Sequence, residues 1–370
     1  MAATDAARLV TRLLARLAAL LGGVFALGQA AAITLPENRA EALAHVYDGD
    51  GVRATGPALL IRKSLADKVS LSASYYVDMV SNASIDVVTT ASPFKETRRA
   101  YTVGADYVER DTLISVSGES SSEPDYQARS LSVDVAQEVF GGMSTVSLGF
   151  TRGSDDVGQK LVGYFDTATH WQYRLGLTQV LTPRWLATAN LEVVADEGYL
   201  GSPYRVARVF GAAVPERNPR TRTSRALKLG GIGSLDEKSA VYGSWRYFWD
   251  TWAVRAHTLE AGYRRYVREG WLADGSLRVV NQDGALFYSD NATAETRYIT
   301  RNRQLASYSS IGLGAKLSAP LGTWAGGYAV TAHGGFERVM YRWRDFTDLR
   351  SGGRYRFDAT VLQLYLTATY

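Results

Sequence analysis

The sequence ends on Val361-Leu362-Gln363-Leu364-Tyr365-Leu366-Thr367-Ala368-Thr369-Tyr370, where apolar residues alternate with polar or amphipathic ones. Successive side chains of a β-strand point to opposite faces, so this stretch predicts a strand with one apolar and one wet face. A strand that ends on a terminal aromatic residue is typical of the closing strand of bacterial outer-membrane barrels. We expect its apolar face to be the C-terminal signal that the barrel-assembly machinery reads: Leu362, Leu364, Leu366 and Tyr370.

The same alternation runs through most of the chain. Residues 68–78, 171–178, 241–250 and 328–337 place apolar side chains at every second position. An amphipathic helix needs a period of about 3.6 residues, which no long stretch shows. After residue 32 no run of about 18 apolar residues offers a spanning helix, so only a closed barrel could pair every backbone group in a membrane. The pattern predicts an all-β fold, a closed antiparallel transmembrane β-barrel.

We expect about sixteen strands, an even number that suits a bacterial barrel with both ends in the periplasm. The first strand is the weakest, and losing it with one other would leave fourteen. The predicted strands are residues 40–48, 53–63, 68–80, 96–108, 111–119, 126–139, 143–152, 168–181, 185–197, 222–234, 238–250, 252–267, 275–288, 302–317, 325–343 and 359–370.

The predicted connections differ in length and mostly alternate, as short periplasmic turns and longer extracellular loops do in such barrels. Short links are expected near residues 64–67, 109–110, 141–142, 182–184, 235–237 and 319–322. Longer loops are expected near residues 81–95, 153–166, 198–221, 289–301 and 345–354.

The N-terminus has the layout of a secretory signal peptide. Arg8, Arg12 and Arg16 precede an apolar run at residues 17–27, and small residues at 29–32 offer a cleavage site. The apolar run is too short to span a membrane, which disfavours the alternative of a retained anchor. We expect residues 1–32 to be removed and residues 33–370 to form one outer-membrane barrel domain.

Composition excludes several classes of function. The net charge is +4 over the chain and near +2 without the first 32 residues, and no basic block dominates, so nucleic acid is not expected as a partner. There is no cysteine, which excludes disulfides, a thiolate metal site and a thiol nucleophile. The 22 tyrosines and 8 tryptophans suit the aromatic girdles of a membrane barrel.

If the apolar positions face lipid, the polar positions face the lumen. Charges of both signs occur there in similar number, so they either pair across strands or form a constriction that filters solutes without a strong preference for one sign. The predicted lumen charges are Asp134, Glu138, Arg174, Glu192, Arg246, Glu260, Arg264, Arg278 and Glu337.

Two further features bear on chemistry. The arginine-rich loop at residues 204–225 could bind phosphate, including that of lipopolysaccharide, although a solvated external loop explains it as well. His333 and Glu337 could share one lumen face, and a histidine–carboxylate pair can orient a base. No partner nucleophile or metal-binding motif accompanies them, so we expect no catalytic residues, no cofactor and no metal site.

A stretch near the first long loop resembles a known family. Residues 76–88, then Ala91-Ser92-Pro93 and Glu96-Thr97-Arg98-Arg99, are similar to the motif of an uncharacterised outer-membrane family, domain of unknown function 3570. That motif reads Asp-x-Ile/Val-Ser-Gly/Ser-Ala-Ser, Asp-Val-Val, Ala-Ser-Pro and Glu-x-Arg, with Asn82 here replacing a small residue. Tyr47-Asp48 with Arg53, and less closely residues 281–288, are similar to two other family segments.

The resemblance implies a barrel with no established activity. Family genes often lie beside a flavin-attaching transferase and thioredoxin-like or lipoprotein genes, which implies by analogy a link to envelope redox modules and lipoprotein partners. The residues where the strand meets the loop could bind a cation, or could cap the loop by hydrogen bonds to its backbone. They are Asp78, Ser81, Ala83, Ser84 and Asp86.

We therefore expect an integral outer-membrane β-barrel of a Gram-negative bacterium, acting as a pore for small solutes or as a docking scaffold for envelope partners. Its surroundings would be outer-membrane lipid and lipopolysaccharide. The alternatives are a barrel enzyme of the lipase or protease kind, and a soluble secreted all-β binding protein.

Overall fold

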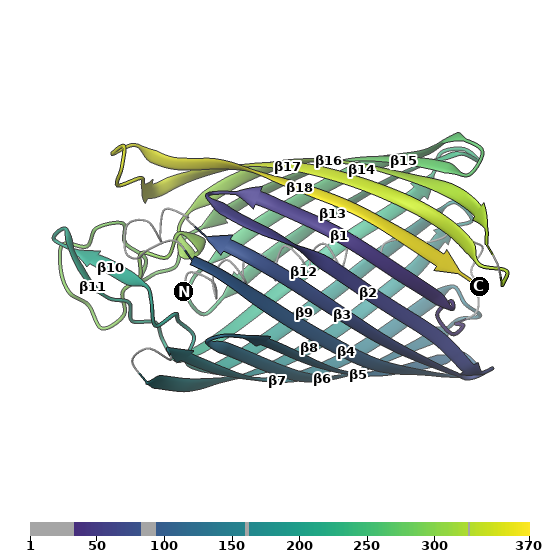
Figure 1. The fold of residues 1–370 in the computed structure, drawn as a ribbon, viewed down its shortest axis with the longest axis horizontal. Helices are drawn as coiled ribbons and strands as arrows, with labels where there is room; N and C mark the ends of the chain where they lie inside the picture. Colours follow the sequence, from purple (N-terminus) through teal and green to yellow (C-terminus); the bar gives the residue numbers. More distant parts are fainter. Residues whose placement is uncertain (1–32, 83–93, 160–162, 325) are drawn as a thin grey trace.

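The computed structural model describes residues 33–82, 94–159, 163–324 and 326–370, and it is a closed antiparallel barrel of sixteen strands (Figure 1). The predicted fold class is confirmed. No helix among the described residues is long and apolar enough to cross a membrane. The barrel strands are β1 (Arg39–Gly49), β2 (Val52–Ala66), β3 (Val69–Asn82), β4 (Phe94–Glu109), β5 (Thr112–Glu123), β6 (Tyr126–Val139), β7 (Ser144–Gln159), β8 (Tyr164–Thr182), β9 (Trp185–Gly198), β12 (Thr221–Ser234), β13 (Ser239–Asp250), β14 (Arg255–Arg268), β15 (Trp271–Asp283), β16 (Tyr308–Thr323), β17 (Ala329–Thr347) and β18 (Arg354–Thr369).

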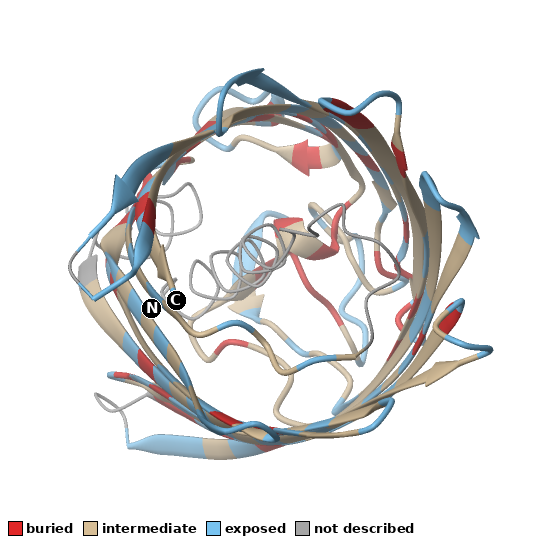
Figure 2. Ribbon diagram, turned by 90° about the vertical axis from the view of Figure 1, so that its right-hand side faces the viewer, coloured by how far each residue is buried: buried red, intermediate tan, exposed pale blue. Residues whose placement is uncertain are grey.

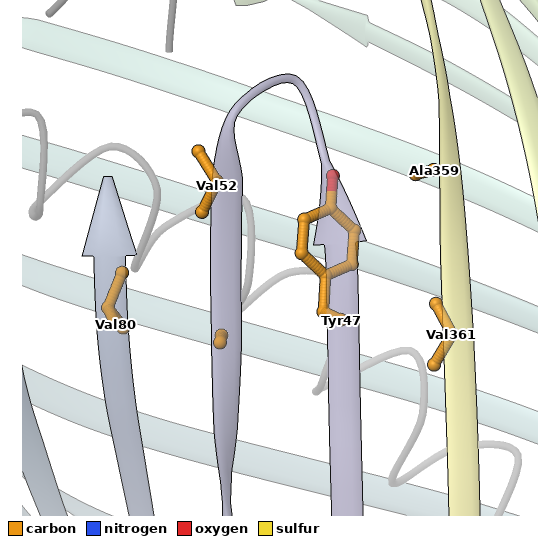
Figure 3. Close-up of a cluster of buried hydrophobic side chains, with 6 residues drawn as sticks. Tyr47, Val52, Val80, Ala359 and Val361 are labelled. Carbon is orange, nitrogen blue, oxygen red and sulfur yellow. The ribbon is translucent and has the colours of Figure 1, made fainter. Parts of the chain in front are cut away.

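The barrel closes between its first and last strands. β1 pairs with β18 from Arg39 opposite Thr369 to Gly49 opposite Ala359. Near the end of this seam, Tyr47 packs on Val361 in a buried cluster that Figure 3 shows. Side-chain packing therefore stabilises β1, which was the least certain of the predicted strands. The barrel has sixteen strands, not fourteen.

The two ends of the barrel differ. Short turns join the strands at one end, named here the turn end, where the C-terminus also lies (Figure 1). The opposite end, named the loop end, carries the β10 (Val206–Val209) and β11 (Ala212–Pro215) hairpin and a 3-10 turn, η2 (Arg303–Leu305). In outer-membrane barrels the short turns are periplasmic.

The outward face is apolar and the inward face is mainly polar, as the alternation requires. Along β18, Leu362, Leu364 and Leu366 point outward and are 43–69% exposed, whereas Tyr365 between them is buried on the inward side. Such an exposed apolar belt suits a surface surrounded by lipid.

Three predicted connections have wrong boundaries: residues 153–166, 319–322 and 289–301. Residues 153–159 continue β7, because Asp155 is held on the inner wall by His170, with 2.7 Å between Asp155 Oδ2 and His170 Nε2. Pro320 and Gly322 lie within β16 at a register shift, where the missing proline N–H is tolerated. The following turn instead uses Gly326 and Gly327, both at positive φ.

The loop predicted at residues 289–301 was too short, since it covers residues 284–307 between β15 and β16. Its apolar residues read as strand in the sequence. In the structure they pack against the inner wall and the β10–β11 hairpin, and do not pair in the barrel.

Candidate functional site: the inner wall and the mouth

The predicted lumen charges alternate with outward apolar residues, which puts them on the inner wall. Asp134 lies between Val133 and Val135 on β6, and Arg174 lies between Tyr173 and Leu175 on β8. The other predicted charges occupy inward positions by the same alternation: Glu138, Glu192, Arg246, Glu260, Arg264, Arg278 and Glu337.

One ion pair joins two strands that are separated by a third strand, and a glycine of that middle strand lies between the paired side chains. Arg174 Nη2 lies 2.8 Å from Asp134 Oδ1, although β7 separates β8 from β6. Gly149 of β7 faces both residues, and a Cβ there would lie 2.1 Å from Asp134 Oδ1. The absence of a side chain at Gly149 therefore leaves the space that the ion pair fills.

Arg278 links two carboxylates of the wall in a similar way. Its Nε lies 3.4 Å from Glu260 Oε2, and its Nη1 lies 3.1 Å from Glu337 Oε1 across β16. Gly312 of β16 lies opposite Arg278, so no side chain blocks the crossing. Arg264 also pairs with Asp274, at 3.1 Å. Cross-strand pairing thus accounts for much of the predicted lumen charge.

Asp78, predicted to bind a cation or cap a loop, contacts a histidine and a tyrosine. His45 Nε2 lies 2.7 Å from Asp78 Oδ1, and the Tyr76 hydroxyl donates to the same oxygen at 3.1 Å. His45 and Asp78 are 3% and 1% exposed. Gly56 of β2 lies opposite His45, so this pair also crosses a strand at a glycine.

The other residues of the strand-to-loop motif lie at or beyond the end of β3. Ser81 ends β3 with Asn82, and Ala83, Ser84 and Asp86 lie outside the described residues.

The suggested pairing of His333 with Glu337 was wrong. Both lie on the inner wall, but His333 Nδ1 is 2.7 Å from Ser318 Oγ, and its ring stacks on Tyr365 with centroids 4.1 Å apart. Glu337 pairs instead with Arg278. Residues four apart on a strand are separated by roughly 13 Å, since each residue advances by about 3.3 Å. Within the described ranges, no three histidine or carboxylate side chains gather into a metal-binding group.

Two loops at the loop end form one structural unit, named here the mouth loops: residues 199–220 and residues 284–307. Ala207 and Val209 of β10 pack on Ile299. Arg217 and Ile299 exchange backbone hydrogen bonds of 3.0 and 2.9 Å, and the Thr300 hydroxyl donates to Glu216. Seen from the turn end in Figure 2, described segments of the far end cross the projected interior of the ring.

Buried arginines attach residues 284–307 to the wall. Arg303, 6% exposed, forms an ion pair with Asp50 in the turn between β1 and β2. The Trp343 indole N–H donates to the Arg303 carbonyl at 2.8 Å. Arg301 lies over the Phe346 ring, 4.2 Å from its centroid. The loop is therefore fixed to β17 and to the first hairpin.

This attachment was not predicted from the sequence. Arginine is rarely buried without partners. The sequence around residues 301–303 does not indicate that Asp50 is the partner of Arg303. The available hint was the run of apolar and aromatic residues within a long connection, including Phe287, Ile299 and Leu305.

Three arginines of the arginine-rich loop pair with carboxylates of other segments. Arg217 lies 2.8 Å from Glu295, and Arg222 donates to Asp250 at 2.7 Å. At the loop-end tip of β8, hydrogen bonds from Arg220 hold the pKa of Asp166 at about 2. That ion pair therefore persists at neutral and mildly acidic pH and is lost only as the pH falls toward that value. These contacts favour a structural role for the loop over a phosphate site.

A family model described as "Protein of unknown function (DUF3570)" matches residues 86–332, more than half of the 370-residue chain. The chain belongs to the DUF3570 family. The resemblance found in the sequence motifs is thereby confirmed. No curated protein matches the sequence.

Three solved structures are similar to this chain at very low sequence identity. A bacterial polysaccharide outer membrane secretin is 9% identical, with 90% of this chain and 99% of that one covered and a TM-score of 0.51. The siderophore receptor PirA from Pseudomonas aeruginosa is 10% identical, with 85% and 60% covered and a TM-score of 0.46. This chain thus spans about 60% of that receptor's length. OmpT, an outer membrane protein of Vibrio cholerae, is 8% identical, with 92% and 100% covered and a TM-score of 0.48.

If the barrel conducts ions, Arg174→Ala is expected to shift its ion selectivity toward cations. The substitution leaves the Asp134 carboxylate unpaired in the lumen, where its side chain is 46% exposed. Stability should change by less than about 1 kcal/mol, because exposed ion pairs contribute little. The reversal potential in a KCl gradient measures the shift. Asp134→Asn is the matched control and should move the potential the opposite way; unchanged potentials in both variants would contradict a solvated lumen pair.

Proposed function

We propose that the DUF3570 barrel is an outer-membrane passage for small polar solutes, in which the mouth loops set the limiting aperture at the loop end. The observation that carries this proposal is a polar inner wall combined with long loops attached to that wall at one end only.

The dimensions and hydration of the barrel support a passage. Barrels of sixteen to eighteen strands are wide enough to enclose an aqueous channel. On the inner wall, the side chains of Arg174 and Asp134 are 32% and 46% exposed, so water reaches the lumen there. Since positive and negative groups pair along the wall, we expect weak preference between anions and cations.

The mouth loops support a fixed aperture. Breaking a buried ion pair by removing one partner costs about 3–5 kcal/mol. The pair between Arg303 and Asp50 is of this kind, with side chains 8% and 2% exposed. Residues 284–307 should therefore stay attached to the wall under ordinary conditions, and solutes would pass beside them.

Passage is favoured over hydrolysis. Ser318 and His333 provide a hydroxyl and an imidazole 2.7 Å apart, but a triad also needs a carboxylate on the other ring nitrogen. Among the described residues, no carboxylate forms an ion pair with His333. We therefore propose no catalytic role for this pair.

The terminal strand supports insertion by the barrel-assembly machinery. Leu362, Leu364, Leu366 and Tyr370 all project from the outward face, where a recognition factor or lipid could reach them. With the turn end in the periplasm, the mouth loops would face the cell exterior.

Liposome swelling tests the proposal. Purified, heat-modifiable protein in liposomes should admit small sugars rapidly and exclude larger ones at a definite size. Heat-denatured protein is the control. Equal swelling rates for folded and denatured protein would contradict a passage.

A further inference from the structure

The outward face of β17 and β18 carries a dense group of arginines beyond the apolar belt, named here the outer arginine stripe. Outward-facing Phe336 and Leu362, each 47% exposed, mark the last part of the belt before the stripe. Two positions farther toward the loop end, β17 carries Arg338 and β18 carries Thr360, and charged residues follow beyond them. The stripe consists of Arg338, Arg342 and Arg344 on β17, and Arg354 and Arg356 on β18, all exposed.

The stripe holds more positive charge than the nearby carboxylates balance. Asp358 accepts from Arg338 at 3.1 Å and from Arg342 at 3.0 Å. Arg344 pairs with Asp283 at 3.0 Å. Neither Arg354 nor Arg356 reaches a carboxylate among the residues that the structure describes. Two carboxylates thus serve five arginines.

The register sets two of these arginines against each other. Arg342 of β17 lies directly opposite Arg356 of β18. Like charges at directly opposed positions destabilise a sheet, so this arrangement is unfavourable for the barrel alone. An anion held between the two side chains would remove the repulsion.

Guanidinium groups match phosphate in shape and charge. Their planar donor forks bind phosphate oxygens in pairs. The stripe adjoins the exposed apolar belt, so an anion bound there would have apolar surface beside it. This combination fits a phosphorylated lipid, whose headgroup lies just beyond its acyl chains, better than a free phosphate ion.

We propose that the outer arginine stripe binds the phosphate groups of an anionic glycolipid of the lipid A type in the outer leaflet. The acyl chains would lie along the apolar belt near Phe336 and Leu362, and Arg342 and Arg356 would share one phosphate. The proposal rests on the outer-membrane location in the proposed function, and it is independent of solute passage.

The test compares Arg342→Gln/Arg356→Gln with wild-type protein in detergent micelles, using bisphosphorylated lipid A as the probe and native mass spectrometry to measure binding. We expect affinity to fall at least about tenfold, since charge-assisted hydrogen bonds contribute about 1.5–3 kcal/mol and 1.4 kcal/mol is tenfold. Arg265→Gln/Arg268→Gln, exposed at the turn end of β14, removes the same charge and should bind as wild type does.

The melting temperature gives a second readout, because the expected effect of Arg356→Gln on it is opposite without and with lipid A. Without lipid A, Arg356→Gln should raise the melting temperature, because it removes repulsion from Arg342. With saturating lipid A, the same variant should melt below wild type. A purely structural stripe would shift the melting temperature in one direction only, and that result would overturn the proposal.

Three other outcomes would also overturn it. Lipid A could bind the double variant as tightly as wild type, or dephosphorylated lipid A could bind wild type equally well. Inorganic phosphate could compete at concentrations comparable to those of lipid A, which would assign the stripe to the free ion. If the double variant fails to fold, Arg354→Gln and Arg356→Gln as single variants carry the same comparison. None of these results bears on liposome swelling. If lipid A binding is refuted, the proposal of solute passage is therefore still tested separately.

Discussion

Replacing residues 286–304 with two glycines is expected to raise the size of the largest sugar that enters liposomes through the barrel, and to increase swelling rates severalfold. The replacement removes the loop segment that is attached to the wall through Arg303. The Ala285 N–H donates to the Leu305 carbonyl at 2.7 Å, so a short linker can join these ends without displacing β15 or β16.

A second excision controls for the removal of loop mass. Val206 pairs with Pro215 at the base of the β10–β11 hairpin, so residues 207–214 can also be replaced with two glycines. Figure 1 places this hairpin beyond the ends of the barrel strands. We expect its loss to leave the size limit nearly unchanged. An unchanged limit after excision of residues 286–304 would show that residues 284–307 do not set the aperture.

Gly56→Ala is expected to prevent formation of a stable barrel. A Cβ at Gly56 would lie 1.8 Å from the Val77 carbonyl oxygen, a distance that requires the backbone of β2 or β3 to move. That movement would also separate His45 from Asp78, which now contact each other at 2.7 Å across β2. We expect a loss of at least about 3 kcal/mol, at the upper end for an overpacked site.

Gly335→Ala is the matched control, because Gly335 also lies on an inward position of the wall. A Cβ at Gly335 would meet its nearest neighbour, Gln363 Oε1, at 3.7 Å, which is ordinary contact. Heat-modifiable gel migration and urea unfolding measure both variants. A Gly56→Ala protein as stable as the Gly335→Ala protein would refute the argument from backbone approach.

The faces of the strands could be predicted from sequence because a membrane barrel imposes one rule at every position. Lipid on one side and water on the other force a period of two, so residues such as Leu364 and Arg174 could be assigned without tertiary information. The closing strand and the inward lumen charges follow from that rule. Ends of strands obey no such rule, which is why Pro320 was misread as a turn although β16 continues through it.

The contacts within the site depend on distant strands, and local patterns do not report these. Arg303 meets Asp50 after more than 250 intervening residues, and His45 meets Asp78 only because β1, β2 and β3 are adjacent. Glycines at the crossing points carry a partial signal. Gly56 and Gly149 interrupt strand patterns, and a glycine within a strand often marks close approach of other groups. Which groups approach becomes clear only from the register.

The most direct test of the proposed passage is the current across a planar lipid bilayer into which folded, heat-modifiable protein has been inserted. We expect discrete and stable current steps with weak preference between potassium and chloride, because the ion pairs of the inner wall balance charge. A bilayer that contains the folded barrel and yet remains electrically silent would contradict a solute passage.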